Sequence, residues 1–173
     1  IPGIEHAISS DQAFHLDRRP DRVVMLGGGY IATEFAGIFH GFGAHVTQLY
    51  RGELFLRGFD ADCRRVLAEE MRGAGIDLRF GVNATAIAQQ GEGYTVTLTD
   101  GSTLPCDLVM AATGRLPNTQ GLGLADAGIT MSERGAVVVD ERFQSSVPSI
   151  HALGDVIDTP QLTPVALAQG TRL

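Results

Sequence analysis

The sequence has no tryptophan and only two cysteines, Cys63 and Cys106, which are far apart along the chain. They form neither a CxxC nor a CxxxxC pair, so no redox dithiol or disulfide framework is indicated. Few cysteines without pairing are typical of a reducing, cytoplasmic environment. The five histidines are scattered, and no Cys and His residues have the spacing of metal ligands.

Long apolar runs and a positive net charge are also missing. No apolar run reaches the length of about 18 residues that a membrane span needs, and no basic and apolar signal segment opens the chain. The net charge of −7 argues against a nucleic-acid-binding surface. With 44% hydrophobic and 19% charged residues, we expect a globular protein with neither nucleic acid nor membrane as partner.

What the sequence does contain is glycine, with 22 residues that fall at turns between short elements. The pattern predicts strands at 22–26, 45–50 and 76–81, and helices at 30–42 and directly after Asp60. The glycines at positions 41, 43, 73 and 75 are expected to end the two helices. This β-α-β-α-β order is typical of half of a doubly wound parallel sheet.

Apolar residues at helical spacing give each helix an expected inner face. These residues are Ile31, Phe35, Ile38, Phe39 and Phe42 on the first helix, and Cys63, Val66, Leu67 and Met71 on the second.

The later part of the chain predicts a different arrangement. Alternation over 84–105 predicts an antiparallel meander, and 106–114 reads as a buried strand that ends at a glycine turn. Two short strands are expected at 135–140 and 149–156, followed by a helix at 162–173 with Pro164 in its first turn. The predicted fold class is therefore α/β: a Rossmann-like parallel sheet with an antiparallel β-meander, of the FAD/NAD(P)-binding domain type.

The segment VVMLGGGYIATEFAG, residues 23–37, joins a strand to a helix through glycines. Gly27, Gly29 and Ala32 fit the pattern G-x-G-x-x-A: Gly27 permits the tight turn, Gly29 lets a pyrophosphate approach the backbone, and Ala32 lets helix and strand pack closely. The helix start would offer free N–H groups to the phosphates. A plain strand–helix turn is the alternative.

The end of the second strand bears on the choice between NAD and NADP. An NAD site usually has Asp or Glu there to bind the ribose 2′-hydroxyl, whereas this chain has Tyr50, followed by Arg51 and, six residues later, Arg57. Two guanidiniums in that place favour a 2′-phosphate, although Glu53 weakens the argument. Ordinary surface charges are the alternative for both arginines.

Four segments together resemble the flavoprotein disulfide reductases, in the order of that family: GGGYIATEFAGIFHGFG, YRGELFLRGFD, LVMAATGRLPNT and IHALGDV…LTPVA. The resemblance covers essentially the whole chain and is greatest to the bacterial glutathione reductase branch. It implies NADP(H) bound by this chain, FAD in the intact protein, glutathione disulfide as substrate, and a homodimer. The redox cysteine pair and the acid–base histidine of the family are absent, so this chain alone is not expected to be active.

The resemblance also implies domain limits and roles for individual residues. Residues 1–20 would be a flanking segment that belongs to the FAD domain. Residues 21–140 would form the NADPH-binding domain, and residues 141–173 would return into the FAD domain. Tyr30 matches a tyrosine that covers the flavin, and Glu34 a glutamate that pairs with a flavin-domain lysine; a turn-capping aromatic and a solvated glutamate are the alternatives.

The remaining expected cofactor contacts follow from the same match. Arg51 and Arg57 would bind the 2′-phosphate, with Gly52 where some members have histidine, and Asp155 would hold the flavin ribityl chain unless it only forms a turn. Arg115 is either structural or a neighbour of the cofactor. The other expected cofactor-binding positions are Ile31 beside the glycine turn, Thr113 and Gly114 near the nicotinamide ribose, Gly154 beside Asp155, Gln161 at the nicotinamide amide and Thr163 at the flavin pyrimidine edge.

Two other classes of function remain open at this point: another enzyme of the same superfamily, and a protein without enzymatic activity. Dihydrolipoamide dehydrogenase, mercuric reductase and trypanothione reductase belong to the same superfamily; Tyr50 argues against the first, which uses NAD. A nucleotide-binding sensor without turnover is the alternative from another class. The segments HALGDV and LTPVA argue against a sensor, because it has no need of flavin contacts.

Overall fold

The computed structural model describes residues 1–173, which divide into two compact units, Ile1–Gly114 and Arg115–Leu173. Each unit is described by itself. The domain limits expected at residues 20 and 140 concern the cofactor domains of a longer chain and stay a prediction.

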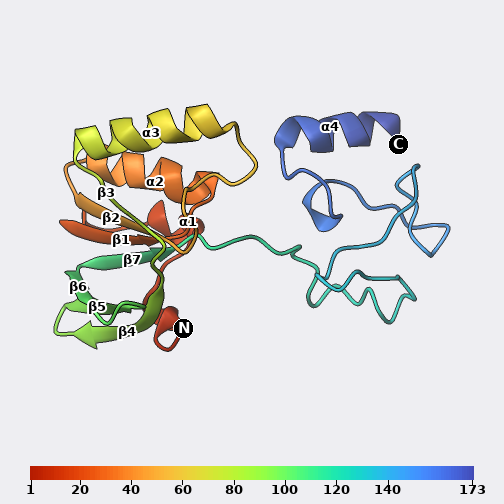
Figure 1. Ribbon diagram of the computed structural model, residues 1–173. Helices are drawn as coiled ribbons and strands as arrows, with labels where there is room; N and C mark the ends of the chain where they lie inside the picture. Colours follow the sequence, from red (N-terminus) through yellow and green to blue (C-terminus); the bar gives the residue numbers. More distant parts are fainter. The chain divides into compact units, whose positions relative to one another are not determined.

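The first unit is built on a four-stranded parallel sheet of order β3-β2-β1-β7 (Figure 1). Its register places Val24 of β1 between Thr47 of β2 and Val109 of β7. Figure 1 shows helices α2 and α3 together over one face of this sheet, and the strands β4, β5 and β6 over the other. The predicted β-α-β-α-β order and α/β class are confirmed. The bounds are β1 Arg22–Leu26, α2 Tyr30–Gly41, β2 His45–Tyr50, α3 Ala61–Ala74, β3 Asp77–Phe80 and β7 Leu108–Ala111.

The predicted meander is confirmed as an antiparallel sheet of order β4-β5-β6. Its strands are β4 Ala84–Gln90, β5 Gly93–Leu98 and β6 Thr103–Cys106. Cys106 therefore belongs to β6 and not to the strand that follows. Successive residues of β1 face opposite sides: Val23 and Met25 pack with the helices, whereas Val24 and Leu26 pack with the meander. A strand buried on both faces explains the unbroken apolar run VVML, residues 23–26.

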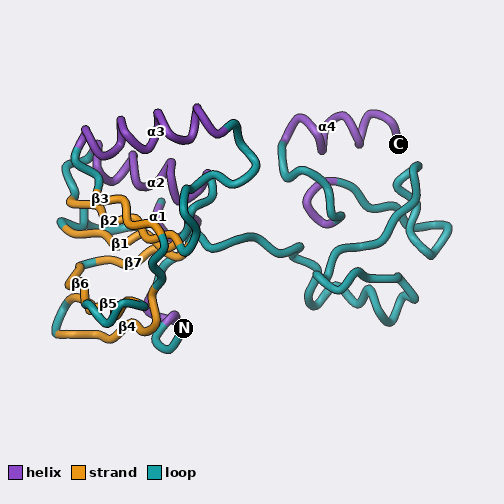
Figure 2. Tube along the Cα trace, viewed as in Figure 1, coloured by secondary structure: helices purple, strands orange, loops and turns teal.

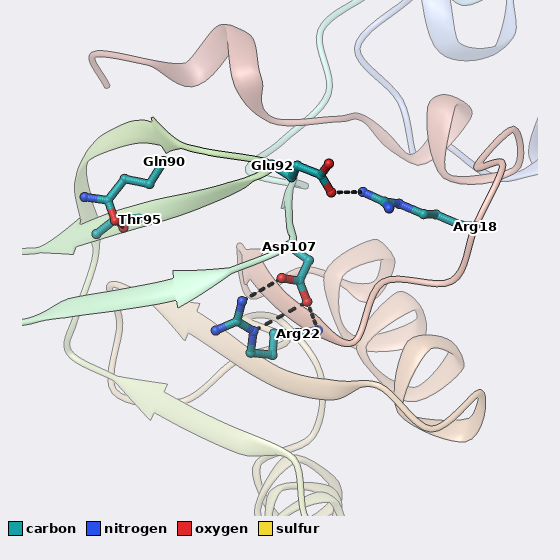
Figure 3. A network of polar contacts seen from close by, with 6 residues as sticks. All are labelled: Arg18, Arg22, Gln90, Glu92, Thr95 and Asp107. Carbon is teal, nitrogen blue, oxygen red and sulfur yellow. Dashed lines mark hydrogen bonds and ion pairs between the residues drawn. The ribbon is translucent and has the colours of Figure 1, made fainter.

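The meander is also tied to the parallel sheet by a polar contact (Figure 3). The backbone N–H of Arg22 donates to Asp107 Oδ2 at 2.9 Å, and its Nη2 donates to Asp107 Oδ1 at 2.7 Å. This contact joins the start of β1 to the link between β6 and β7.

The predicted inner faces of the two helices are confirmed only in part, for Phe39 on α2 and Met71 on α3. Helix α2 buries Ala32, Thr33, Ala36 and Phe39, while Phe42 is 71% exposed. The physical reason is that small side chains let a helix approach the sheet closely, so the contact stripe lies on the alanines rather than on the bulkiest residues. Ile31 and Phe35 lie at the edge of the core, half-buried, and Ile38 is exposed.

Helix α3 shows the same shift toward small residues. It buries Ala68 and Met71, whereas Cys63 is exposed, as are Val66 and Leu67. Its ends agree better with prediction, since the Asp60 carboxylate accepts from Asp62 N–H and Cys63 N–H, and Gly75 caps the end with φ 109°. Gly73 lies inside the helix, so it does not end it.

Two short elements precede β1: the 3-10 helix η1, Ile4–His6, and helix α1, Ser10–Ala13. Neither has a buried residue.

The second unit has little regular structure (Figure 2). It contains the 3-10 helix η2, Gly154–Val156, and helix α4, Thr163–Arg172, which begins as predicted with Pro164 in its first turn. The strands predicted at 135–140 and 149–156 do not form, because each segment pairs for one residue only, Val137 with Met131 and His151 with Gln144. Their apolar residues instead surround a small core centred on Ile129, Val137 and Ile157.

None of the helices combines the length and the apolar character that crossing a membrane requires.

Candidate functional site

The glycine turn between β1 and α2 has the local geometry that its sequence predicts. Gly27 has φ 134°, and a Cβ placed on it would lie 2.3 Å from the carbonyl oxygen of Ala112, so no larger residue fits without displacement. A Cβ on Gly29 would meet nothing within 4 Å, which leaves the backbone open on that side. Ala32 is fully buried, where it packs the helix onto the strand.

Helix α2 presents an uncapped amino terminus at this turn. Its first intrahelical hydrogen bond runs from Thr33 N–H to Gly29 O at 3.1 Å, and no side chain caps the helix. The N–H groups of Tyr30, Ile31 and Ala32 lie ahead of that bond, at the positive end of the helix dipole. Such a terminus suits an anionic group.

Two buried polar side chains hold the turn from beneath, and the sequence reasoning missed both. Gln48 of β2 is fully buried, and its Nε2 donates to Gly27 O at 3.0 Å. The Thr33 hydroxyl donates to Gly29 O at 3.1 Å. A glutamine in a strand expected to lie inside the sheet was the available signal, because a buried amide needs a partner.

The loop after β2, residues 51–60, contains the two predicted arginines and is called the arginine loop below. Arg51 and Arg57 are both exposed, and neither forms a hydrogen bond or an ion pair within the chain. Between them, Phe55 is fully buried in the core. The loop is thus anchored from inside while both guanidiniums face solvent.

Tyr50 stands at the end of β2, where a carboxylate would bind a ribose hydroxyl. Its ring is half-buried between Gly28 and Gly52: an added Cβ would lie 2.3 Å from the ring at Gly28 and 2.7 Å from it at Gly52. The two glycines therefore make room for an aromatic ring in the place of an acid.

The strand β7 ends at the same edge of the sheet as β1 and β2, since all three run parallel. Ala112 N–H donates to Leu26 O at 2.8 Å, which holds the start of the next turn beside the glycine turn. Thr113 and Gly114 follow and are exposed. The structure thus brings the glycine turn, the start of the arginine loop and Thr113–Gly114 to the carboxyl edge of one sheet, the usual ligand position in such folds.

Glu34 lies on the first part of α2 and is exposed, without a hydrogen bond or ion pair within this chain. Tyr30 is 43% exposed. Neither side chain belongs to the buried core of the first unit.

In the second unit, Gly154 and Asp155 form a turn held by several polar contacts, among them those from Ile157 N–H and the Thr159 hydroxyl to Gly154 O. Gly154 has φ 70°, and its N–H donates to Gln169 Oε1 at 2.7 Å. Asp155 Oδ2 lies 3.5 Å from Arg115 Nη2, so Arg115 has a structural contact with the predicted cofactor-binding acid. The buried Gln169 on α4 was not identified from the sequence; its only signal was a polar residue on the inner side of that helix.

Gln161 and Thr163 lie beside the start of α4. Gln161 is half-buried and Thr163, the first residue of the helix, is exposed. No side chain caps α4. Pro164 has no N–H, and the Val165 N–H donates to Leu162 O at 3.0 Å, so the Thr163 N–H is the one left without a partner in the first turn, fewer than at the start of α2.

The thiols and possible metal ligands do not form a second site. Cys63 is exposed and Cys106 is buried, both as free thiols. Burial raises the pKa of the Cys106 thiol to about 11, which keeps it protonated and unreactive near neutral pH. No group of three or more His, Cys, Asp or Glu side chains could hold a metal ion.

Comparisons with known proteins agree with this geometry. The sequence profile of the family described as "Pyridine nucleotide-disulphide oxidoreductase" matches residues 1–170. The glutathione reductase of Burkholderia cepacia is 49% identical over 98% of this chain and 38% of its own length. The trypanothione reductase of Trypanosoma congolense is 45% identical over 98% of this chain and 35% of its own length.

Solved structures give the same result. The Cu(II) complex of the HOCl-induced flavoprotein disulfide reductase RclA from Escherichia coli superimposes with a TM-score of 0.95, at 34% identity, over 100% of this chain and 40% of that one. LpdA from Mycobacterium tuberculosis gives a TM-score of 0.88, at 31% identity, over 99% and 37%. The chain thus spans little more than a third of the length of these relatives. On sequence and structure alike, this chain belongs to the pyridine nucleotide-disulphide oxidoreductase family.

Proposed function

We propose that this chain is the NADPH-binding part of a FAD-dependent glutathione-disulfide reductase. Its share of the reaction is to bind the dinucleotide, select its 2′-phosphate and orient the nicotinamide. In the intact protein, NADPH supplies a hydride to the flavin, whose electrons then reach a redox disulfide and glutathione disulfide. A homodimer in the cytoplasm is part of the same proposal.

The observation that carries the proposal is the arginine loop at the end of β2. Arg51 and Arg57 have no partner within the chain, and Tyr50 replaces the acid that an NAD site uses. Each charge-assisted hydrogen bond to a phosphate contributes about 1.5–3 kcal/mol. Even about 3 kcal/mol in total favours NADPH over NADH roughly a hundredfold.

The residues present fit a dinucleotide pyrophosphate. The backbone at Gly29 is open where a Cβ would otherwise stand, and the uncapped N–H groups of α2 supply donors for a negatively charged ligand. Gly27 and Ala32 are in close contact with neighbouring residues, so among these three positions only Gly29 leaves space beside the backbone. This donor set supports binding by backbone amides with arginines at the ribose end.

The flavin-related residues extend the proposal to the second cofactor. Tyr30 would cover the flavin face, and Glu34 would pair with a lysine of the flavin domain; both are exposed, and neither side chain forms a hydrogen bond or an ion pair within the chain. In the second unit, Asp155 would bind the ribityl hydroxyls beside Gly154. Gln161 and Thr163, at the uncapped start of α4, would approach the nicotinamide amide and the flavin pyrimidine edge.

Titration calorimetry with NADPH and NADH tests the cofactor assignment. On the intact gene product we expect NADPH to bind more tightly, and the preference to fall at least tenfold in the double variant Arg51→Ala/Arg57→Ala. Arg65→Ala is the matched control, because Arg65 is an exposed arginine that pairs with Asp62 on α3. Equal binding of the two cofactors by the parent protein would overturn the proposal.

Trypanothione reductase is the second candidate, because the relative from Trypanosoma congolense is nearly as similar as the glutathione reductase. The arginine loop distinguishes cofactors and not disulfides. Rates with glutathione disulfide and trypanothione disulfide, measured on the same preparation, decide between them.

A further inference from the structure

A third arginine, Arg64, contacts the arginine loop and is less exposed to solvent than Arg51 and Arg57. Arg64, on the first turn of α3, is half-buried. Its Nε donates to Phe55 O at 2.6 Å, and its Nη2 donates to Leu54 O at 2.5 Å. One planar guanidinium therefore binds two consecutive carbonyls of the loop, a forked geometry that lysine cannot reproduce.

The loop that Arg64 holds is under conformational strain. Leu56 has φ 55°, a left-handed conformation that residues with a side chain rarely adopt. Its N–H donates to Gly28 O at 2.6 Å, which connects the arginine loop directly to the glycine turn. Such a conformation persists only when surrounding contacts hold it, and the Arg64 fork acts on the two residues immediately before it.

The two ends of the loop are fixed separately. Val82 N–H donates to Tyr50 O at 3.3 Å, and Gly81 N–H donates to Gly52 O at 3.0 Å. At the far end, the Asp60 carboxylate caps α3. The middle of the loop, from Leu54 to Arg57, is held by the burial of Phe55, by the packing of Leu54 and Leu56 against the core, by the backbone bonds of Leu56 to Gly28 and Phe59, and by Arg64.

We infer that Arg64 is a positioning residue for nucleotide specificity: it fixes the backbone on which Arg57 stands and so sets the preference for a 2′-phosphate. This inference rests on the proposed function. We do not propose Arg64 as a phosphate ligand, because two of its N–H groups already donate to loop carbonyls. A pre-ordered loop binds its ligand without the cost of ordering it first.

The chain offers a matched control in the next residue. Arg65 lies on the same turn of α3, is exposed and pairs only with Asp62. Replacing either arginine removes one positive charge from the same helix turn. A difference between Arg64→Ala and Arg65→Ala therefore reports the loop contact and not the change in net charge.

The test uses 2′,5′-ADP and 5′-AMP as probes, titrated by calorimetry into the intact gene product. For Arg64→Ala we expect the ratio of the two affinities to fall about tenfold, with 5′-AMP affinity changed less than about twofold. Arg64→Lys should fall between the parent and Arg64→Ala, and Arg65→Ala should keep the parent ratio. Circular dichroism and the melting temperature verify that each variant is folded.

Several results would overturn the inference. If Arg64→Ala keeps the ratio, or weakens both probes equally, the contact is only structural. If Arg64→Ala does not fold, Arg64→Lys decides, and an unchanged ratio in that variant counts against it. If the parent protein binds the two probes equally, the proposed function is wrong as well. If the preference for 2′,5′-ADP is lost in Arg51→Ala/Arg57→Ala but kept in Arg64→Ala, only this inference is wrong.

Discussion

The two units of the chain hold their predicted cofactor residues by different means. In Ile1–Gly114, the glycine turn follows a strand whose neighbours on both sides fix its register. In Arg115–Leu173, the turn at Gly154 and Asp155 follows no strand at all, and only single bridges connect the segments around it.

This difference changes what each turn depends on. The first turn depends on backbone geometry, on the space that glycine leaves and on hydrogen bonds from Gln48 and Thr33, and it follows a strand held by ladder hydrogen bonds on both sides. The second has no ladder beside it and is contacted by the Gln169 and Arg115 side chains. Substitutions at the glycines of the first turn should therefore act through sterics, whereas Gln169 substitutions should act through a lost polar partner.

The largest expected effect is that of Gly27→Ala. A Cβ would lie 2.3 Å from Ala112 O on a backbone with φ 134°, so steric overlap and strain together should destabilise the first unit by about 3 kcal/mol or more. Gly29→Ala is the matched control: its Cβ meets nothing within 4 Å, and the expected cost is below about 1 kcal/mol. Urea unfolding of the two variants measures both, and equal costs would mean that the close approach at Gly27 is relieved by movement.

A smaller loss is expected for Gln169→Ala in the second unit. The substitution removes the acceptor of the Gly154 N–H, and an unpaired buried donor costs about 1–3 kcal/mol. Gln169→Glu keeps an acceptor at that place and should retain most of the stability near neutral pH. Hydrogen exchange at the Gly154 amide reports the contact directly; slow exchange persisting in Gln169→Ala would show that another group protects the turn.

The regular part of the fold was predictable because it repeats. The strands predicted at 22–26, 45–50 and 76–81, the alternating meander and the Asp60 cap follow local or periodic rules, and these predictions were confirmed. The helix faces were not predictable in the same way, since Ala36 and Ala68 carry weak hydrophobic signals yet are buried in the core between helix and sheet. The strand predicted at 135–140 failed because apolar alternation needs a partner along its whole length, and this segment has one for a single residue.

The candidate site divides along the same line. Gly27, Gly29 and Ala32 could be placed from spacing alone, because their requirement is local. Gln48 and Gln169 could not, because each binds a backbone group 21 and 15 residues away, respectively. Contacts from a side chain to a distant carbonyl or amide leave no periodic trace in a sequence.

The smallest expected effect is a pH dependence carried by Asp107 in the first unit. The pKa of this carboxyl lies below its usual value of 3.8, chiefly because the Arg22 side chain donates a hydrogen bond to it. The carboxylate thus stabilises the folded state at pH values above its unfolded pKa, and this contribution is lost as the pH falls through the lower folded pKa. Asp107→Asn should be less stable than the parent at pH 7, and the difference should shrink toward pH 3.

A second ion pair in the same region supplies the control for Asp107 (Figure 3). Arg18 and Glu92 are 3.7 Å apart with side chains 79% and 91% exposed, so water and salt screen them. Arg18→Ala should leave the unfolding midpoint unchanged at pH 7, and its difference from the parent should not depend on pH. If Asp107→Asn behaves like Arg18→Ala in urea unfolding at both pH values, the contact between Arg22 and Asp107 contributes no net free energy to folding. The first unit would then depend on its strand ladders and its apolar cores without this ion pair, which would sharpen its contrast with the side-chain contacts of the second.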